Sequence, residues 1–170
     1  KKDAIETAIQ VAKNDWIITT DADCLVQKNW LTTFNQYIQE NEVEMVASGV
    51  CYVPKSGFLS AFQNLDFLSL QGATIGSFGI DQPFMCNGAN FSYSKHFFKE
   101  LNGFQGNQTI ASGDDVFLLQ KAVSVAPKKV GFLLAKESIV ATKPTESWSD
   151  LFQQRVRWAS KSTGDRKSVV

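Results

Sequence analysis

The chain alternates short, β-rich apolar runs with longer segments whose apolar residues recur at helical spacing. The run at 16–20, Trp-Ile-Ile-Thr-Thr, lacks polar alternation, as a strand buried on both faces does. Further strands are predicted over 44–53, 84–94, 129–135 and 138–142. Helices are predicted over 4–12, 29–42, 58–76, 95–104, 114–126 and 146–162. This alternation predicts an α/β fold with a mixed, mostly parallel sheet flanked by helices.

The first helical pattern stands at the very start of the chain, with no strand signal before it. A right-handed strand–helix–strand unit needs that preceding strand. We therefore expect residues 1–170 to form a single, partial domain of a longer protein, with one or more N-terminal strands absent.

Composition excludes several classes of protein. With 44% hydrophobic and 20% charged residues among 170, the chain is neither disordered nor fibrous. Seventeen basic residues balance seventeen acidic ones, which argues against a general nucleic-acid binder. Its three cysteines form no Cys-x-x-Cys pair, which suits free thiols better than a disulfide framework or a zinc site.

Two carboxylates, Asp21 and Asp23, follow the first predicted strand directly. The carboxyl edge of an open α/β sheet is where ligands bind. Carboxylates one residue apart repel each other unless a cation or a proton lies between them, and Mg²⁺ or Mn²⁺ prefers such oxygen ligands together with substrate phosphates. The Asp-Ala-Asp segment is therefore a candidate metal–diphosphate site. The alternative is a solvated turn in which Asp23 caps the next helix.

A second acidic pair, Asp114 and Asp115, stands at the predicted start of a helix. Ser112 and Asp115 have the spacing of a capping box, and acidic residues favour a helix's first turn, so capping explains the pair by itself. The functional alternative is a general base that takes a proton from an attacking hydroxyl.

The third element is the segment Gln-Arg-Val-Arg-Trp, residues 154–158. All three arginines of the chain lie near its C-terminus, and residues 153–170 carry five Lys/Arg and one Asp. Arg157 could grip a diphosphate in a two-point manner while Trp158 offers an apolar face to a sugar. The alternative is an ordinary amphipathic helix with a solvated basic side.

Taken together and in this order, these segments resemble the family 2 glycosyltransferases of the nucleotide-diphospho-sugar transferase (GT-A) fold. The resemblance is strongest to the branch related to processive, membrane-associated polysaccharide synthases. That branch has a DxD motif, a [T/G][E/D]D motif and a QxxRW motif, matched here by 21–23, 113–115 and 154–158. The resemblance to the family extends over essentially the whole chain.

The resemblance implies a role for each matched residue. Asp23 and Asp21 would bind a divalent metal, Mg²⁺ or Mn²⁺, on the donor pyrophosphate. Asp115 would be the catalytic base, with Asp114 beside it. Gln154, Arg157 and Trp158 would hold the acceptor end or the diphosphate. The segment 87–90, Asn-Gly-Ala-Asn, matches a loop near the donor sugar through Asn87, Gly88 and Asn90.

The resulting functional hypothesis is an inverting glycosyltransferase that uses a UDP- or GDP-sugar donor and a saccharide or lipid-linked acceptor. Two alternatives are a nucleotidyltransferase on a similar fold and a non-catalytic carbohydrate- or cation-binding domain. The resemblance places the full-length protein on the cytoplasmic side of the membrane, with membrane contact only in that longer form. The isolated chain is expected to be soluble and weakly active or inactive.

Overall fold

The computed structural model describes residues 2–106 and 113–163. Its main sheet has the strand order β1–β4–β2–β5, formed by Trp16–Thr19, Phe91–Ser94, Met45–Ser48 and Val130–Leu133. Strand β4 is antiparallel to both β1 and β2, whereas β2 and β5 are parallel. Strands β1, β2 and β5 therefore point in one direction, and the predicted mixed, mostly parallel sheet is confirmed.

A smaller sheet pairs β3 (Val50–Tyr52) with β6 (Val140–Thr142) in parallel. The single strand predicted over 44–53 is therefore wrong in one respect, because Gly49 divides it between two sheets. The Gly49 carbonyl oxygen accepts hydrogen bonds from the Val140 backbone N–H at 3.1 Å and from the Asn90 side chain at 2.7 Å. A glycine inside a strand pattern can mark a break, but it does not indicate which strand the residues after it join.

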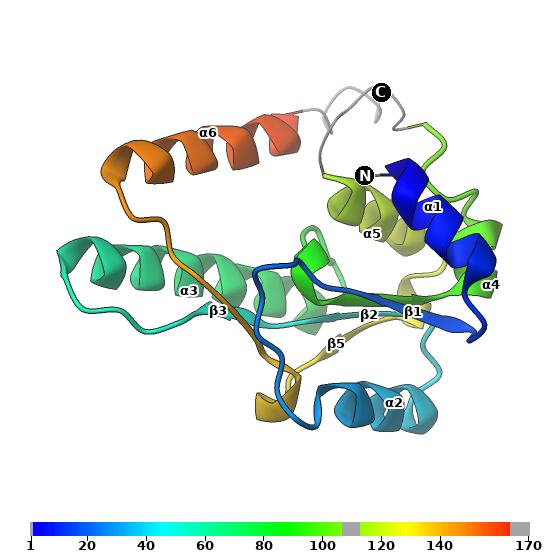
Figure 1. Ribbon diagram of the computed structural model, residues 1–170. Coiled ribbons are helices and arrows are strands. Elements are labelled where there is room, and N and C mark those ends of the chain that lie inside the picture. The colour runs from blue at the N-terminus through cyan, green and yellow to red at the C-terminus, as the bar shows by residue number, and fades with distance from the viewer. Residues whose placement is uncertain (1, 107–112, 164–170) are drawn as a thin grey trace.

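Helices cover both faces of the main sheet, as Figure 1 shows. Helix α2 (Trp30–Glu40) lies on one face, and α1 (Lys2–Val11), α3 (Phe58–Gly79) and α5 (Asp114–Val125) lie on the other. Helix α4 (Lys95–Glu100) follows β4 directly, and α6 (Trp148–Thr163) runs above α3. Three short 3₁₀ turns complete the fold: η1 (Gly88–Asn90), η2 (Pro127–Lys129) and η3 (Lys136–Ser138). The segment predicted as extended over 84–94 is thus η1 followed by β4.

The central strand β2 is buried from both sides. Met45 and Ala47 pack into the cluster under α1 and α5, whereas Val46 faces the cluster formed with Trp30 and Phe34 of α2. None of the three strand residues exposes measurable surface. This two-sided burial explains why the strand sequences lack polar alternation.

The carboxyl end of β1 and the amino end of β4 meet at one edge of the sheet, because the two strands are antiparallel with Thr19 opposite Phe91. The Asp-Ala-Asp segment leaves this edge and η1 enters it. Within the described ranges, no helix is both long and apolar enough to cross a membrane.

Candidate active site

The Asp21–Asp23 segment forms a tight turn directly after β1. The Cys24 backbone N–H donates to the Asp21 carbonyl oxygen at 3.1 Å, which folds the segment back on itself. One carboxylate oxygen each from Asp21 and Asp23 and the Cys24 Sγ lie within 4.8 Å of one another. The Thr142 hydroxyl on β6 donates to Asp23 Oδ2 at 3.4 Å. Both exposed carboxylates are therefore gathered at one point.

The chemistry of this donor set suits a hard divalent cation. Carboxylate oxygens are preferred ligands of Mg²⁺ and Mn²⁺, which complete their coordination with water and phosphate oxygens. Partial burial is the main cause that raises the pKa of the Cys24 thiol above its ordinary value. Mg²⁺ and Mn²⁺ prefer oxygen ligands to sulfur, so the two carboxylates are the groups here that fit such a metal.

Asp115 is held from across the site by a backbone amide. The Gly88 N–H donates to Asp115 Oδ2 at 2.7 Å, and the Val116 N–H donates to Oδ1 at 3.0 Å. The Thr19 hydroxyl donates to the Gly88 carbonyl oxygen at 2.7 Å. The end of β1, η1 and the first turn of α5 are thus joined through Gly88.

The proposed capping box is only partly within the described structure. Ser112 lies outside the described residues, and the N-cap of α5 is Gly113, which adopts a left-handed conformation with φ of 86°. No side chain caps the helix at that position. The Asp115 carboxylate is directed toward η1 as well as toward its own helix.

Asp114, by contrast, is buried. It exposes 6% of its surface, and its Oδ1 lies 3.4 Å from the Lys2 Nζ on α1. The ion pair joins the first turns of α1 and α5. Asp114 still lines the same cavity as Asp115, so the paired acids have unequal surroundings.

A cavity of about 360 Å³ connects the two acidic segments. Asp21, Asp114, Asp115 and Gly88 lie along its wall, together with Thr19 and apolar side chains of α1, β1 and β4. Residues that are far apart in the sequence, Asp21 and Asp115, therefore face one cavity.

The η1 loop is built by its two asparagines. The Asn87 side chain accepts from the Ala89 N–H at 3.0 Å and so closes the turn. Asn90 is fully buried; it accepts from the Trp30 indole N–H at 3.0 Å and donates to the Ser138 carbonyl oxygen at 2.8 Å. In this structure Asn90 supports the loop from below, and a direct contact with a sugar stays a prediction.

The predicted C-terminal motif lies on α6, above β3 and α3. The Tyr52 hydroxyl donates to Gln154 Oε1 at 3.4 Å, and the Trp158 ring lies 6.0 Å from the Phe67 ring, centroid to centroid. Trp158 also packs against the cluster that includes Ala89, the middle residue of η1. Trp158 thus packs beside η1 and Gln154 lies beside β3, whereas Arg157 is exposed.

Sequence reasoning missed the residues that support this motif. Tyr52 and Phe67 contact it from β3 and α3, and Asp66 on α3 forms an ion pair with Arg155. One signal was available: Asp66 is the single charged residue between Phe58 and Gly79. An isolated charge in an apolar helix predicts a specific partner.

Residues 1–161 match the family model described as glycosyltransferase like family 2. Since the match spans nearly the whole chain, this protein belongs to that family. Its mixed α/β architecture is that of a GT-A-like glycosyltransferase domain, and the predicted fold class is confirmed. A search of curated proteins found no match.

Proposed function

We propose that this chain is the catalytic domain of an inverting glycosyltransferase. It would move a sugar, of hexose type, from a UDP- or GDP-sugar to a hydroxyl of a saccharide or lipid-linked acceptor. The observation that carries the proposal is the shared cavity of Asp21 and Asp115, in which one carboxylate of the acidic turn after β1 and the carboxylate held by Gly88 face one space. Family membership supports glycosyl transfer in general, and this geometry supports the division of roles.

Asp21 and Asp23 would hold the metal of the reaction. A Mg²⁺ or Mn²⁺ ion bound there supplies positive charge that offsets the charge of a nucleoside diphosphate leaving group. The two carboxylates would hold the metal on the donor pyrophosphate at the end of β1, and Asp21, which lines the cavity with Asp115, would place the donor sugar on that side.

Asp115 would act as the base. The acceptor hydroxyl oxygen forms a bond to the anomeric carbon, while the bond from that carbon to the diphosphate oxygen breaks on the opposite face. The hydroxyl proton passes to the Asp115 carboxylate, and the bond electrons leave with the nucleoside diphosphate. The Gly88 N–H, at 2.7 Å, fixes the direction of this carboxylate.

The acceptor would lie beneath α6. Trp158 packs against the cluster that includes Ala89 of η1, and Gln154 lies beside Tyr52 of β3. Arg157 adds a permanent positive charge on the same helix. We assign the chain on this basis to the polysaccharide-synthase branch, whose full-length members act at the cytoplasmic face of the membrane. That residues 1–170 form a partial domain with little activity alone also stays a prediction.

The catalytic role is tested by Asp115→Asn in the full-length protein. Asn keeps the size of the side chain but cannot take the proton, so transfer should fall by about 10²–10⁴-fold. Binding of UDP or GDP, followed by calorimetry, should stay near that of the wild type. Asp81→Asn, the same change at an exposed acid whose φ of 57° suits Asn, is the matched control. Turnover of Asp115→Asn within about threefold of the wild type would leave Asp115 without a catalytic role.

The metal assignment is tested separately by Asp23→Ala. Titration of Mn²⁺ by calorimetry, with and without UDP or GDP, should show binding that strengthens with the nucleotide in the wild type and is lost in the variant. Asp15→Ala removes another exposed acid near β1 and should bind as the wild type does. Metal binding without any turnover in the wild-type protein would favour the cation-binding alternative.

A further inference from the structure

We infer that Asp66 and Arg155 are positioning residues that orient the Gln154 and Trp158 side chains for the acceptor. This inference rests on the proposed function. Neither residue is one that the three motifs specify: Asp66 lies in the middle of α3, and Arg155 stands at an x position of QxxRW, between Gln154 and Arg157. The two residues are identified by their contacts with each other and by the contacts of Arg155 with Gln154 and Trp158.

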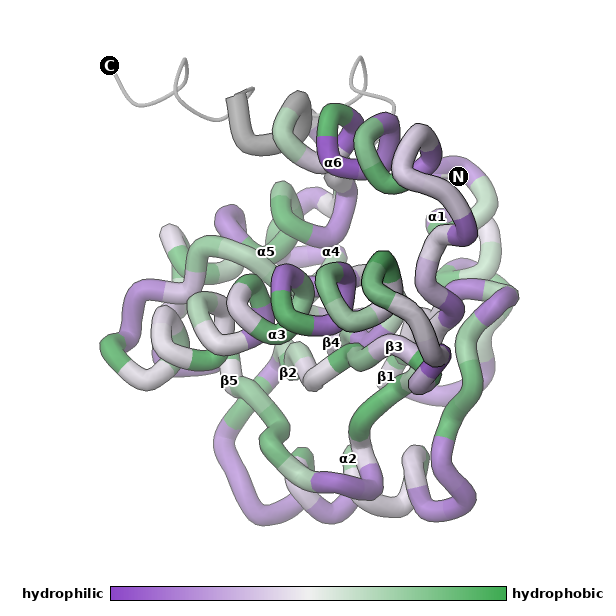
Figure 2. The backbone as a smooth tube through the Cα atoms, turned by 90° about the vertical axis from the view of Figure 1, so that its left-hand side faces the viewer, coloured by the Kyte–Doolittle hydropathy of each residue, from purple (hydrophilic) through white to green (hydrophobic). Residues whose placement is uncertain are grey.

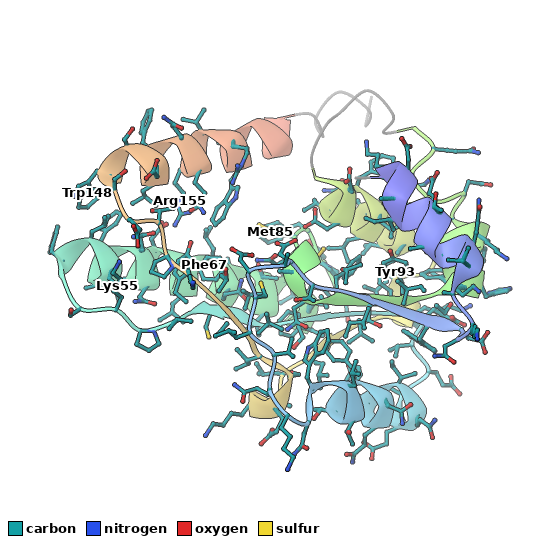
Figure 3. All side chains as sticks on the ribbon, in the orientation of Figure 1. Lys55, Phe67, Met85, Tyr93, Trp148 and Arg155 are labelled. Atoms are coloured by element: carbon teal, nitrogen blue, oxygen red, sulfur yellow. The ribbon has the colours of Figure 1, made fainter. Side chains whose placement is uncertain are left out.

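The Arg155 guanidinium is fixed from below by α3. Its Nε donates to Asp66 Oδ2 at 2.7 Å, and its Nη2 contacts the same oxygen. The side chains expose only 24% and 34% of their surface for Arg155 and Asp66, so solvent screens the pair incompletely. In Figure 3 the labelled Arg155 extends from α6 toward α3, on the side where Phe67 lies.

The same guanidinium sets the direction of the Gln154 amide. Arg155 Nη1 donates to Gln154 Oε1 at 2.7 Å, and the Tyr52 hydroxyl donates to that oxygen at 3.4 Å. Because an arginine only donates hydrogen bonds, the amide oxygen must face it. The NH₂ end of Gln154 is therefore turned away from Arg155, where it can donate to an acceptor oxygen.

Arg155 also holds the indole of Trp158. The guanidinium carbon lies 4.3 Å from the indole centroid, a cation–π contact. Phe67, the residue after Asp66, contacts the same indole. One arginine thus fixes both side chains that the acceptor would meet, and Asp66 fixes the arginine.

The test compares Asp66→Asn, Arg155→Gln and the double variant in the full-length enzyme, with steady-state kinetics for each substrate. Each single change should raise the acceptor KM by about fivefold, as expected for a partly buried ion pair, and leave the donor KM unchanged. The double variant should resemble Arg155→Gln, because Asp66 acts through the guanidinium that this change removes.

The matched control is Glu146→Gln. Glu146 forms an ion pair with Lys55, which also joins the segments that precede α6 and α3, but it is exposed, with 55% and 85% of the Lys55 and Glu146 side chains accessible. This variant should keep wild-type KM values, since an exposed pair contributes little.

Hydrogen exchange of the α6 amides gives a readout that needs no activity. Exchange over residues 148–159 should accelerate in Asp66→Asn and Arg155→Gln and stay unchanged in Glu146→Gln. Unchanged exchange would overturn the inference even if the wild type shows no transfer and the proposed function fails. In an active enzyme, an unchanged acceptor KM, or single-variant effects that simply add, would also overturn it.

Discussion

At the scale of single residues, the site depends on how closely Gly88 approaches Asp115. A Cβ atom on Gly88 would lie 2.9 Å from Asp115 Oδ2 and 3.3 Å from the Asp115 Cβ. Gly88→Ala must therefore displace the carboxylate and lengthen the hydrogen bond that directs it. Because a misplacement of about 1 Å can cost roughly 10²-fold in rate, we expect transfer to fall by about 10–100-fold, measured as kcat with saturating donor and acceptor.

Gly72→Ala is the control for this change. Gly72 lies on α3 with open space around it, and alanine in a helix interior is more stable than glycine by about 0.5–1 kcal/mol. This variant should keep its rate and unfold at slightly higher urea concentration. Wild-type kcat in Gly88→Ala would show that the Gly88 N–H does not direct the base.

At the scale of the element, α6 brings its motif to the site as one unit. Figure 2 shows apolar residues along much of α3 and alternating apolar and hydrophilic residues on α6. Trp158→Ala removes the ring that packs against Phe67, so it should raise the acceptor KM. Arg157→Lys keeps the positive charge but loses the planar guanidinium fork, so it should lower kcat. Both effects are measured by varying the acceptor concentration at saturating donor.

Gln153→Ala, an exposed position on the same helix, should behave as the wild type in these assays. If both Arg157→Lys and Trp158→Ala also show wild-type kinetics, α6 is an ordinary amphipathic helix and the synthase branch loses its main support.

At the scale of the whole molecule, the ion pair between Lys2 and Asp114 joins α1 to α5 beside the cavity. Lys2→Met keeps the aliphatic stem but leaves the buried Asp114 carboxylate without this countercharge. We expect the free energy of unfolding to fall by about 1–3 kcal/mol, the usual cost of an uncompensated buried polar group. Urea unfolding measures it, with Lys13→Met, an exposed lysine, as the control. Equal midpoints for both variants would contradict a structural role for the pair.

The sequence alone determined the type of most elements and the side chains available to the candidate site. Apolar runs without alternation predicted the buried strands, and helical spacing predicted α2, α3, α5 and α6, because both signals are local. The acidic segments could be placed at the ends of elements for the same reason. The break at Gly49 could not be predicted, since it depends on which strand, β5 or β6, lies alongside.

Only the tertiary structure decided which of these residues meet. Asp21 and Asp115 face one cavity because β4 returns antiparallel to β1 and places η1 between them. Asp114 and Asp115 have unequal surroundings because α1 places Lys2 beside Asp114. Asp66 can support Gln154 and Trp158 through Arg155 because α6 packs on α3. The sequence specifies side-chain chemistry and local periodicity, but contacts across the fold depend on how separate elements pack.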